Sequence, residues 1–400
     1  MSALCPVCTL SLPLSQIESH VNCHFDDDVI DPQLATDHYL ALQLASSSDP
    51  SPSTSSSNSD DSSKAPTLAS SQTKSTFYSV GNGGLISLLK NCLESESKSK
   101  SKPSDCSTTL LSGFVDHFQS SKEDKGWGCG WRNIQMQCSH LLSHREEAKR
   151  VLFGGSNFVP DIPSLQRFLE IAWSNGFDVS GALHFNSQIS GSKRWIGTTE
   201  CAALLRSFGL KARVVDFAPK KAQSMYLSVP GSAIAPKAKT YGPMDRYVVK
   251  KGESGKEKTV DSHGSGSNAS KISKGAVLME WVWNYFSGNR LNVSSGVHMT
   301  SKGPLYFQHE GHSRTIVGIQ RRLQGTTFTP QYSLLILDPS DFTKAIEKAL
   351  VEKRGWEKHL KRGAHTLTCP EYQILYVDDG IADGEELEQL KTIDSHFVEF

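Results

Sequence analysis

The sequence predicts an α+β fold in which helices pack face to face on an antiparallel sheet, with a small N-terminal module and a flexible linker ahead of it. Three features of the chain lead to this prediction. Apolar residues recur at helical spacing through the first half of the region 76–400, and strand-like segments follow in its second half. A serine-rich stretch, residues 47–75, separates this region from a short segment that holds several cysteines and histidines.

Length and charge narrow the class of protein. The 400 residues exceed what one compact domain usually needs, so we expect one large folded unit with appendages. Lys and Arg number 42, as do Asp and Glu, and this zero formal charge favours neither nucleic acid nor a membrane surface as a partner. No apolar run approaches the length that crosses a bilayer, and the first residues do not resemble a secretory signal. The nine cysteines are irregularly spaced, so we expect metal or catalytic roles for them in a cytoplasmic and nuclear protein.

Residues 1–25 have the ligand spacing of a C2H2-type zinc finger. Two cysteines with two residues between them are followed, after eleven residues, by two histidines with three residues between them: Cys5, Cys8, His20 and His24. Two thiolates and two imidazoles can meet at one tetrahedral zinc ion, so we expect a structural zinc here. Cys23 could replace His24 as the fourth ligand. Residues 16–20 include no Lys or Arg, so we expect this finger to bind a protein rather than DNA.

Residues 26–46 predict a short acidic amphipathic helix. Asp37 lies in its acidic first part. Its apolar face consists of Leu40, Ala41 and Leu44, and the small Ala41 lets another surface approach closely. The pattern resembles the inverted ubiquitin-interacting motif, in which an acidic residue is followed after two others by Leu-Ala-x-x-Leu. The alternative is an ordinary amphipathic helix.

Polar stretches divide the rest of the chain. The linker 47–75 is dominated by Ser with Pro, Asp and Thr, and it cannot bury enough apolar surface to fold. A Lys/Ser tract at 95–104 follows a possible helix at 85–93 and predicts an exposed loop. Residues 218–274 are polar and charged, and we expect an insertion between two structured halves of the domain 76–400.

The domain 76–400 shows helical periodicity first and strand periodicity afterwards. Helices are expected at residues 164–173, 200–208 and 276–286. Strands are expected at residues 211–217, 313–320, 332–337 and 373–377. In the last of the helices, Val277, Trp281 and Tyr285 are expected to face the core.

Cys129 is the first candidate for chemistry. It lies between Gly128 and Gly130, directly before a segment with apolar residues at helical spacing, so it is predicted to begin a core-facing helix. A helix N-terminus has unpaired N–H groups and partial positive charge, which would lower the cysteine pKa and leave donors for an oxyanion. The alternative is a buried cysteine beside a glycine turn.

A histidine and an aspartate lie where two predicted strands would meet. His312 opens the first strand and Asp338 follows the second. In an antiparallel hairpin the beginning of one strand lies beside the end of the next, so His312 and Asp338 are expected to be neighbours. The carboxylate would then fix the imidazole tautomer while the imidazole faces Cys129 across a cleft. Taken singly, the histidine could be a surface or core residue and Asp-Pro a simple turn.

Four motifs, in order, make the sequence resemble the papain-like cysteine peptidases named for cleaving the ubiquitin-fold modifier. The motifs are residues 126–133, 195–200, 304–315 and 337–339. The resemblance is strongest to the zinc-finger branch, which acts on ubiquitin. It spans residues 76–400 and implies a papain-like fold with an antiparallel sheet packed on helices. It also implies Cys129 as nucleophile, His312 as general base and Asp338 as orienting acid.

Ser340 separates this chain from proteases specific for the ubiquitin-fold modifier. Those proteases typically have a histidine directly after Asp-Pro, where this chain has Ser340. The resemblance therefore implies a deubiquitinating cysteine peptidase that hydrolyses isopeptide bonds in polyubiquitin. The resemblance also implies a preference for long chains joined through lysine sixty-three. The alternatives are a protease for the ubiquitin-fold modifier and a catalytically silent ubiquitin adaptor.

The expected reaction uses side chains alone. Cys129 would attack the carbonyl at the C-terminal glycine of ubiquitin, and His312 would take the thiol proton and return it to the leaving lysine amine. N–H groups at the head of the Cys129 helix would hold the oxyanion, with His117, twelve residues upstream, as a candidate side-chain donor. Zinc is expected only as the structural ion of the finger. The protein is expected to act as a monomer, with ubiquitin and polyubiquitin as partners and no contact to nucleic acid or membrane.

Overall fold

The computed structural model describes five segments of the domain 76–400 and three short strands. The segments are residues 84–99, 106–219, 274–288, 293–324 and 329–399. The short strands are β1 (Ser2–Leu4), β2 (Ser11–Pro13) and β3 (Tyr78–Ser79). β1 and β2 pair antiparallel. Several predicted features lie outside the described residues, namely the zinc ligands Cys5, Cys8, His20 and His24, the helix residues Asp37, Leu40, Ala41 and Leu44, the linker 47–75 and most of the insertion 218–274.

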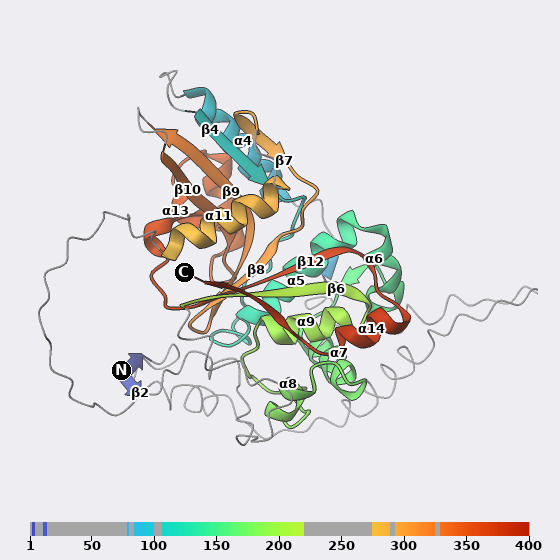
Figure 1. Ribbon diagram of the computed structural model, residues 1–400. Coiled ribbons are helices and arrows are strands. Elements are labelled where there is room, and N and C mark those ends of the chain that lie inside the picture. Colours follow the sequence, from blue (N-terminus) through green and yellow to red (C-terminus); the bar gives the residue numbers. More distant parts are fainter. Residues whose placement is uncertain are drawn as a thin grey trace, which may run out of the picture.

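A nine-stranded sheet forms the centre of the described fold (Figure 1). Its strands are β4 (Cys106–Leu111), β6 (Leu210–Ala218), β7 (Gly296–Met299), β8 (Leu305–His309), β9 (His312–Gln324), β10 (Thr329–Leu337), β11 (Lys361–Gly363), β12 (Tyr372–Ile381) and β13 (Ser395–Glu399). The order is β11-β10-β9-β8-β12-β6-β13, and β4 pairs with both β7 and β9. Within it, β6, β9, β10 and β12 confirm the four predicted strands.

The sheet is mixed rather than antiparallel, which corrects the prediction. Most neighbouring strands are antiparallel, but β4 pairs parallel with β7, and β13 pairs parallel with β6. Parallel neighbours require a long crossover connection, and such a connection leaves no local mark in the sequence. The α+β class itself is confirmed.

Helices cover the sheet and lie beside it. They are α4 (Gly84–Ser99), α5 (Cys129–His144), α6 (Glu146–Val151), α7 (Ile162–Ser174), α8 (Val179–His184), α9 (Thr198–Arg206), α11 (Lys274–Ser287), α12 (Thr343–Val351), α13 (Glu357–Leu360) and α14 (Gly384–Leu390). Two 3₁₀ turns, η1 (Leu152–Gly155) and η3 (Ala364–Thr366), and the short strand β5 (Phe158–Val159), which pairs with β3, complete the described elements. The predicted helices correspond to α7, α9 and α11.

Side chains alternate between two apolar layers, one on each face of the sheet. Leu334 and Ile336 of β10 pack in the layer that includes α11, whereas Leu335 and Leu337 pack in the layer that includes α5 and α9. Because the side-chain period of a strand is two, one strand supplies both layers. In Figure 1, α11 crosses in front of β9 and β10.

Two predicted details differ in the structure. In α11 the buried face is not the predicted one, because Trp281 and Tyr285 are only partly buried and stack on each other at the edge of their layer. The residues of α11 buried against the sheet are Leu278, Met279, Val282, Trp283 and Phe286. The tract 95–104, predicted as a loop, begins inside α4, which continues to Ser99. Glu96 anchors this part of the helix by accepting hydrogen bonds from Arg322 and Lys361.

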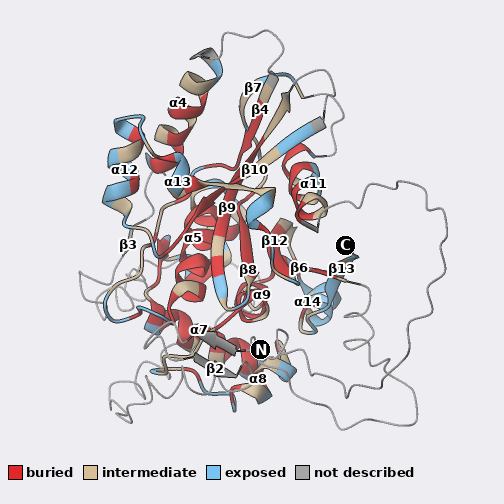
Figure 2. Cartoon of the chain, turned by 90° about the vertical axis from the view of Figure 1, so that its left-hand side faces the viewer, coloured by how far each residue is buried: buried red, intermediate tan, exposed pale blue. Residues whose placement is uncertain are grey.

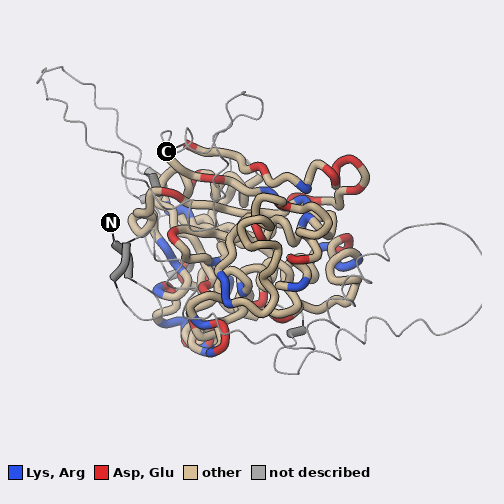
Figure 3. Tube along the Cα trace, turned by 90° about the horizontal axis from the view of Figure 1, so that it is seen from below, with Lys and Arg blue, Asp and Glu red and all other residues tan. Residues whose placement is uncertain are grey.

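α5 is buried along most of its length (Figure 2), including every position from 130 to 142. Its polar side chains are satisfied inside the protein; for example, the amide of Gln135 donates to the carbonyl oxygen of Pro160 at 2.7 Å. Along the chain trace of Figure 3, Lys and Arg residues are interspersed with Asp and Glu residues. Of the helices in the described segments, none has both the length and the apolar composition that spanning a bilayer requires.

Candidate active site

Cys129 begins α5, as predicted, and a buried ion pair holds the turn that leads into it. The carbonyl oxygen of Asp124 accepts hydrogen bonds from the N–H groups of Trp127 at 3.3 Å and Gly128 at 2.8 Å. The Asp124 carboxylate binds Arg132, one turn into the helix, with Nε–Oδ2 at 3.0 Å and Nη2–Oδ1 at 2.8 Å. Both side chains are buried. The bidentate pair therefore fixes the cysteine relative to its helix.

The glycine directly after Cys129 permits close packing. A Cβ on Gly130 would lie 2.7 Å from the carbonyl oxygen of Ile196, which is closer than real Cβ atoms approach. The turn before α9 therefore sits directly on the first turn of α5. Trp195 in this turn donates its indole N–H to the carbonyl oxygen of Gly126 at 2.7 Å. This hydrogen bond fixes the Trp195 side chain beside the residues that precede Cys129.

β9 and β10 form the predicted antiparallel hairpin, with His312 as the first residue of β9 and Asp338 directly after β10. The register pairs Leu337 with Thr315. Asp338 is consequently next to Arg314 and not opposite His312. His312 and Asp338, which were predicted to be neighbours, are therefore offset by two residues along the hairpin.

One pocket nevertheless brings the predicted residues together. Its volume is about 620 Å³, and Cys129, His312 and Asp338 all line it. Trp195 contributes an apolar wall, and Phe342 lies at the rim with 70% of its surface exposed. The structure therefore places the nucleophile, base and acid of the predicted set in one concave site.

The Asp338 carboxylate is bound by Arg314 and Ser340. Nε of Arg314 lies 2.6 Å from Oδ2, and the N–H and hydroxyl of Ser340 donate to Oδ1 at 2.9 Å and 2.7 Å. Burial opposes the ionisation of Asp338, but Arg314 and Ser340 outweigh it and lower the pKa. Among the described hydrogen bonds, none joins His312 to Asp338 or to Cys129. The expected imidazole–carboxylate bond is therefore not made in this conformation.

Burial raises the pKa of Cys129, which corrects the prediction of a lowered value from its place at a helix N-terminus. Hydrogen bonds from Ser313 and from the N–H of Gly130 favour the thiolate, while the charge of Asp338 opposes it. Removal from water is the largest of these effects, so the thiol is protonated at neutral pH. Attack by Cys129 consequently needs a base.

His312 has the charge state that a base requires. Although the residue is exposed at the surface, partial removal of its ring from water and then the Arg314 cation lower its pKa from the ordinary value of 6.5, and Asp338 and Glu310 offset part of this shift. The imidazole is therefore neutral at neutral pH and can accept a proton.

His117 binds Asp338 and does not line the pocket. Its Nε2 lies 2.9 Å from the carbonyl oxygen of Asp338, and its Nδ1 lies 2.9 Å from the hydroxyl of Thr343. Because a carbonyl oxygen only accepts, Nε2 carries the proton, and this donor is not free for an oxyanion. Burial lowers the pKa of His117, so the ring is neutral. The geometry gives His117 the function of holding the chain at Asp338.

Asn133 belongs to the site, although the sequence reasoning gave it no function. Its Nδ2 donates to the carbonyl oxygen of Cys129 at 2.7 Å and to the hydroxyl of Ser313 at 3.0 Å, and its Oδ1 accepts from Thr315 at 2.7 Å. Asn133 is fully buried. The sequence contained one indication of this function: Asn133 lies four positions after Cys129, and residues with that spacing lie on the same face of a helix.

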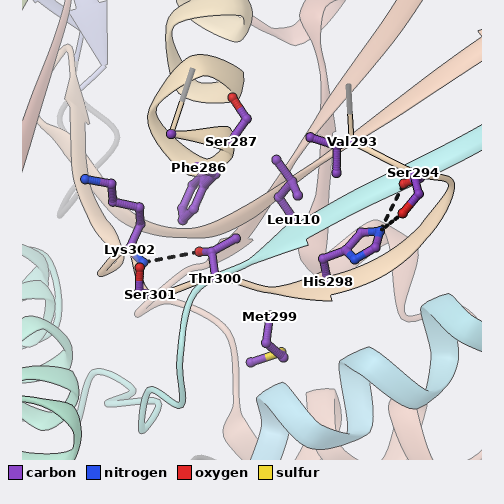
Figure 4. A pocket seen from close by; sticks show the side chains of 11 residues that line it. Leu110, Phe286, Ser287, Val293, Ser294, His298, Met299, Thr300, Ser301 and Lys302 are labelled. Carbon is purple, nitrogen blue, oxygen red and sulfur yellow. Dashed lines mark hydrogen bonds between the residues drawn. The ribbon is translucent and has the colours of Figure 1, made fainter. Parts of the chain in front are cut away.

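A second pocket lies between the C-terminal end of α11 and β7 (Figure 4). Its volume is about 440 Å³. The imidazole of His298 there donates from Nε2 to the carbonyl oxygen of Ser294 at 2.9 Å, so the ring is tied to the backbone. The described residues lining it include no cysteine and no carboxylate, and we assign no chemistry to it. Elsewhere in the described segments, no group of three or more His, Cys, Asp and Glu side chains is arranged to hold a metal ion.

A cysteine at a helix N-terminus that shares one pocket with a histidine and an aspartate from a hairpin is the arrangement of the cysteine peptidases. The chain belongs to peptidase family C78, whose family model matches residues 104–375.

Relatives with similar sequences are named as ubiquitin peptidases. Human zinc finger-containing ubiquitin peptidase 1 is 33% identical over 285 residues, which cover 71% of this chain and 39% of that protein. The chain thus matches well under half the length of this relative. Ubiquitin carboxyl-terminal hydrolase mug105 of Schizosaccharomyces pombe is 26% identical over 274 residues, which cover 68% of this chain and 84% of that protein.

Two further similarities are more limited. Ufm1-specific protease 1 of Mus musculus is 32% identical over 105 residues, 25% of this chain and 38% of that protein. The crystal structure of UfSP from C. elegans aligns with a TM-score of 0.35 at 15% identity, covering 68% of this chain and 34% of that chain. A structural likeness this weak carries no conclusion about function.

Proposed function

We propose that this chain is a deubiquitinating cysteine peptidase that hydrolyses isopeptide bonds in polyubiquitin. The main support is the single pocket that holds Cys129, His312 and Asp338. The names of the relatives from human and fission yeast, both of which mention ubiquitin, support ubiquitin as the substrate. Ubiquitin and polyubiquitin chains are then the partners, and the chain acts as a monomer.

In the proposed mechanism His312 takes the proton of the Cys129 thiol, and the sulfur attacks the carbonyl carbon of the C-terminal glycine of ubiquitin. Backbone N–H groups at the head of α5 hold the oxyanion of the tetrahedral intermediate. The intermediate collapses as His312 protonates the leaving lysine amine. Water, deprotonated by His312, then hydrolyses the thioester and releases Cys129. Asp338 stabilises the imidazolium formed in the first step.

The pocket walls suit a substrate tail that ends in glycine. The indoles of Trp127 and Trp195 both line the pocket beside Cys129. Glycine residues, which lack side chains, bring a backbone carbonyl past aromatic lining residues to the sulfur with the least steric hindrance. This shape supports a Gly-Gly tail as the group that enters.

We extend the proposal to the N-terminal modules. Cys5, Cys8, His20 and His24 bind a structural zinc ion, and this finger takes no part in the chemistry. The spacing of these residues and the pairing of β1 with β2, which flank both cysteines in the sequence, support this assignment. The name of the human relative also mentions a zinc finger.

The helix predicted over 26–46 binds ubiquitin through Asp37, Leu40, Ala41 and Leu44 in this proposal, and the chain prefers lysine-sixty-three-linked polyubiquitin. Both points are supported by the motif resemblance in the sequence. We place the protein in the cytoplasm and nucleus, because the irregular spacing of its nine cysteines favours a reducing compartment.

Two activity probes test the substrate assignment. Ubiquitin and the ubiquitin-fold modifier, each ending in a thiol-trapping group, are incubated with the full chain, with Cys129→Ala and with Cys92→Ala. Cys92 is a free thiol of α4 outside the pocket, so its variant is the control. Labelling by the ubiquitin probe, lost only in Cys129→Ala, is the expected result. Labelling by neither probe would favour a silent ubiquitin adaptor.

A protease for the ubiquitin-fold modifier is the second candidate, and the partial similarity to Ufm1-specific protease 1 favours it. Ser340 argues against it, because those proteases typically have a histidine at this position, whereas Ser340 here donates two hydrogen bonds to Asp338. Labelling by the modifier probe alone would reverse the assignment.

A further inference from the structure

Asp338 has a basic neighbour that the proposed mechanism does not use. Arg314 lies two residues after His312 on β9 and lines the same pocket. Its Nε is 2.6 Å from Oδ2 of Asp338, and its Nη1 is 2.8 Å from Nε2 of His309. The guanidinium is therefore held from two sides, by the candidate acid and by the last residue of β8.

His309 is a neutral acceptor for Arg314. A guanidinium only donates, so Nε2 of His309 accepts and its Nδ1 carries the proton. Nδ1 lies 3.3 Å from the sulfur of Cys369, so each ring nitrogen of His309 has a hydrogen-bond partner. Burial and the Arg314 charge lower the pKa of His309 to about 3. The ring consequently stays neutral at working pH, and Arg314 keeps this partner when the pH changes.

The hydrogen bonds at Asp338 leave one place for His312. A carboxylate oxygen accepts about two hydrogen bonds. Oδ1 already accepts two, both from Ser340, whereas Oδ2 accepts one, from Arg314. The open position is therefore on Oδ2, beside the guanidinium. When His312 reaches Asp338, it must share this oxygen with Arg314.

We propose that Arg314 is a positioning residue for the reaction: it presents Oδ2 of Asp338 to His312 and places a positive charge in the pocket beside that imidazole. The proposal rests on the proposed function. After partial removal of the ring from water, the Arg314 charge is the largest influence that lowers the pKa of His312. The charged or titratable groups around His312 are Arg314 of β9, His309 of β8, Glu310 of the turn, Asp338, Cys129 of α5 and the pocket lysines Lys122 and Lys125.

The pH dependence of kcat/KM for a fluorogenic ubiquitin substrate tests the proposal in the full chain. In Arg314→Gln the acid limb should move to higher pH by about one unit, because loss of the cation favours the imidazolium form of His312. Arg314→Lys keeps the positive charge, so its acid limb should stay near that of the wild type. It loses the planar guanidinium that holds Asp338 in place, so kcat should fall. An unchanged acid limb in Arg314→Gln would show that Arg314 only supports the fold, even where activity is lost.

A histidine NMR titration separates this inference from the proposed function. The His312 ring signal is followed in a Cys129→Ala background and assigned by its loss in His312→Asn. Arg314→Gln should raise the midpoint of His312 whatever the substrate is, and His309→Ala, which removes one support of Arg314, should raise it less. A midpoint that does not move overturns the inference. Failure of the wild type to cleave ubiquitin, with a midpoint that does move, overturns only the proposed function.

Discussion

The side-chain amide of Asn133 lies 3.0 Å from the hydroxyl of Ser313 and joins the helix that carries Cys129 to the strand that carries His312. The same nitrogen donates to the carbonyl oxygen of Cys129, so the nucleophile and the start of β9 are linked through one buried group. Hydrogen bonding by Ser313 also favours the thiolate form of Cys129 and so works against the rise of its pKa. The relative position of Cys129 and His312 therefore depends on an amide that does not take part in the chemistry.

Asn133→Ala should lower kcat/KM by about 30-fold, because loss of buried hydrogen bonds worth about 2 kcal/mol lets α5 shift relative to β9. Turnover of a ubiquitin substrate and thermal unfolding are measured together. Gln166→Ala removes another buried amide, one on α7 that bonds to the backbone of Ser192 and Gly191 outside the site. It should reduce stability comparably and change kcat/KM little. Equal activity losses in the two variants would refute a specific function for Asn133.

The Asp124–Arg132 pair should be among the strongest single contributions to the turn before Cys129. Arg132→Met leaves the Asp124 carboxylate buried without its cation and should cost about 3–5 kcal/mol in denaturant unfolding. The double variant Asp124→Leu with Arg132→Met should recover much of this loss, since no uncompensated charge remains. A double variant as unstable as the single one would contradict the ion-pair explanation.

The same pair predicts a loss of stability in acid. Burial opposes ionisation of Asp124, but hydrogen bonds and the charge of Arg132 outweigh it and lower the pKa below the ordinary 3.8. A lowered carboxyl pKa stabilises the fold above the ordinary value, and the contribution disappears as the pH falls through the folded-state pKa. Unfolding free energy measured against pH should therefore decline below about pH 4 and decline less in the double variant.

Phe342 should contribute to substrate binding and little to stability. Its side chain is 70% exposed at the pocket rim, so folding gains little from it. Phe342→Ala should raise KM by about fivefold, equivalent to about 1 kcal/mol of lost apolar contact, with kcat and the melting temperature nearly unchanged. Val351→Ala, an exposed apolar residue at the other end of α12 and outside the pocket lining, is the control. Identical KM values for the two variants would exclude contact between Phe342 and substrate.

Cys129 should react slowly with iodoacetamide at neutral pH and faster as the pH rises, because its partly buried thiol has a raised pKa. Alkylation is followed by mass spectrometry of the peptide that contains Cys129, with Cys129→Ala to identify it. The ubiquitin probe should label the same residue much faster, because a bound tail positions the reacting carbon. Fast alkylation already on the acid side of neutrality would indicate a thiolate–imidazolium pair in the free protein.

Local patterns in the sequence were sufficient for the α+β class, for the helix that starts at Cys129 and for the hairpin of β9 and β10. Each depends on residues near one another in the chain. Glycines flank Cys129 at the helix start, and apolar residues at period two mark the strands. The same patterns predicted that Cys129, His312 and Asp338 belong together, and the structure places all three in one pocket.

Only the tertiary structure decided the register, the charge state and the supporting contacts of the site. The hairpin register places Asp338 beside Arg314. This register includes a shift between Leu335 and Ile336, and the pattern of apolar residues in the sequence does not reveal that shift. The raised pKa of Cys129 follows from burial, which depends on packing by residues far away in the chain. The mixed sheet likewise depends on crossover connections. Desolvation and long-range pairing are properties of the assembled core, so no local segment encodes them by itself.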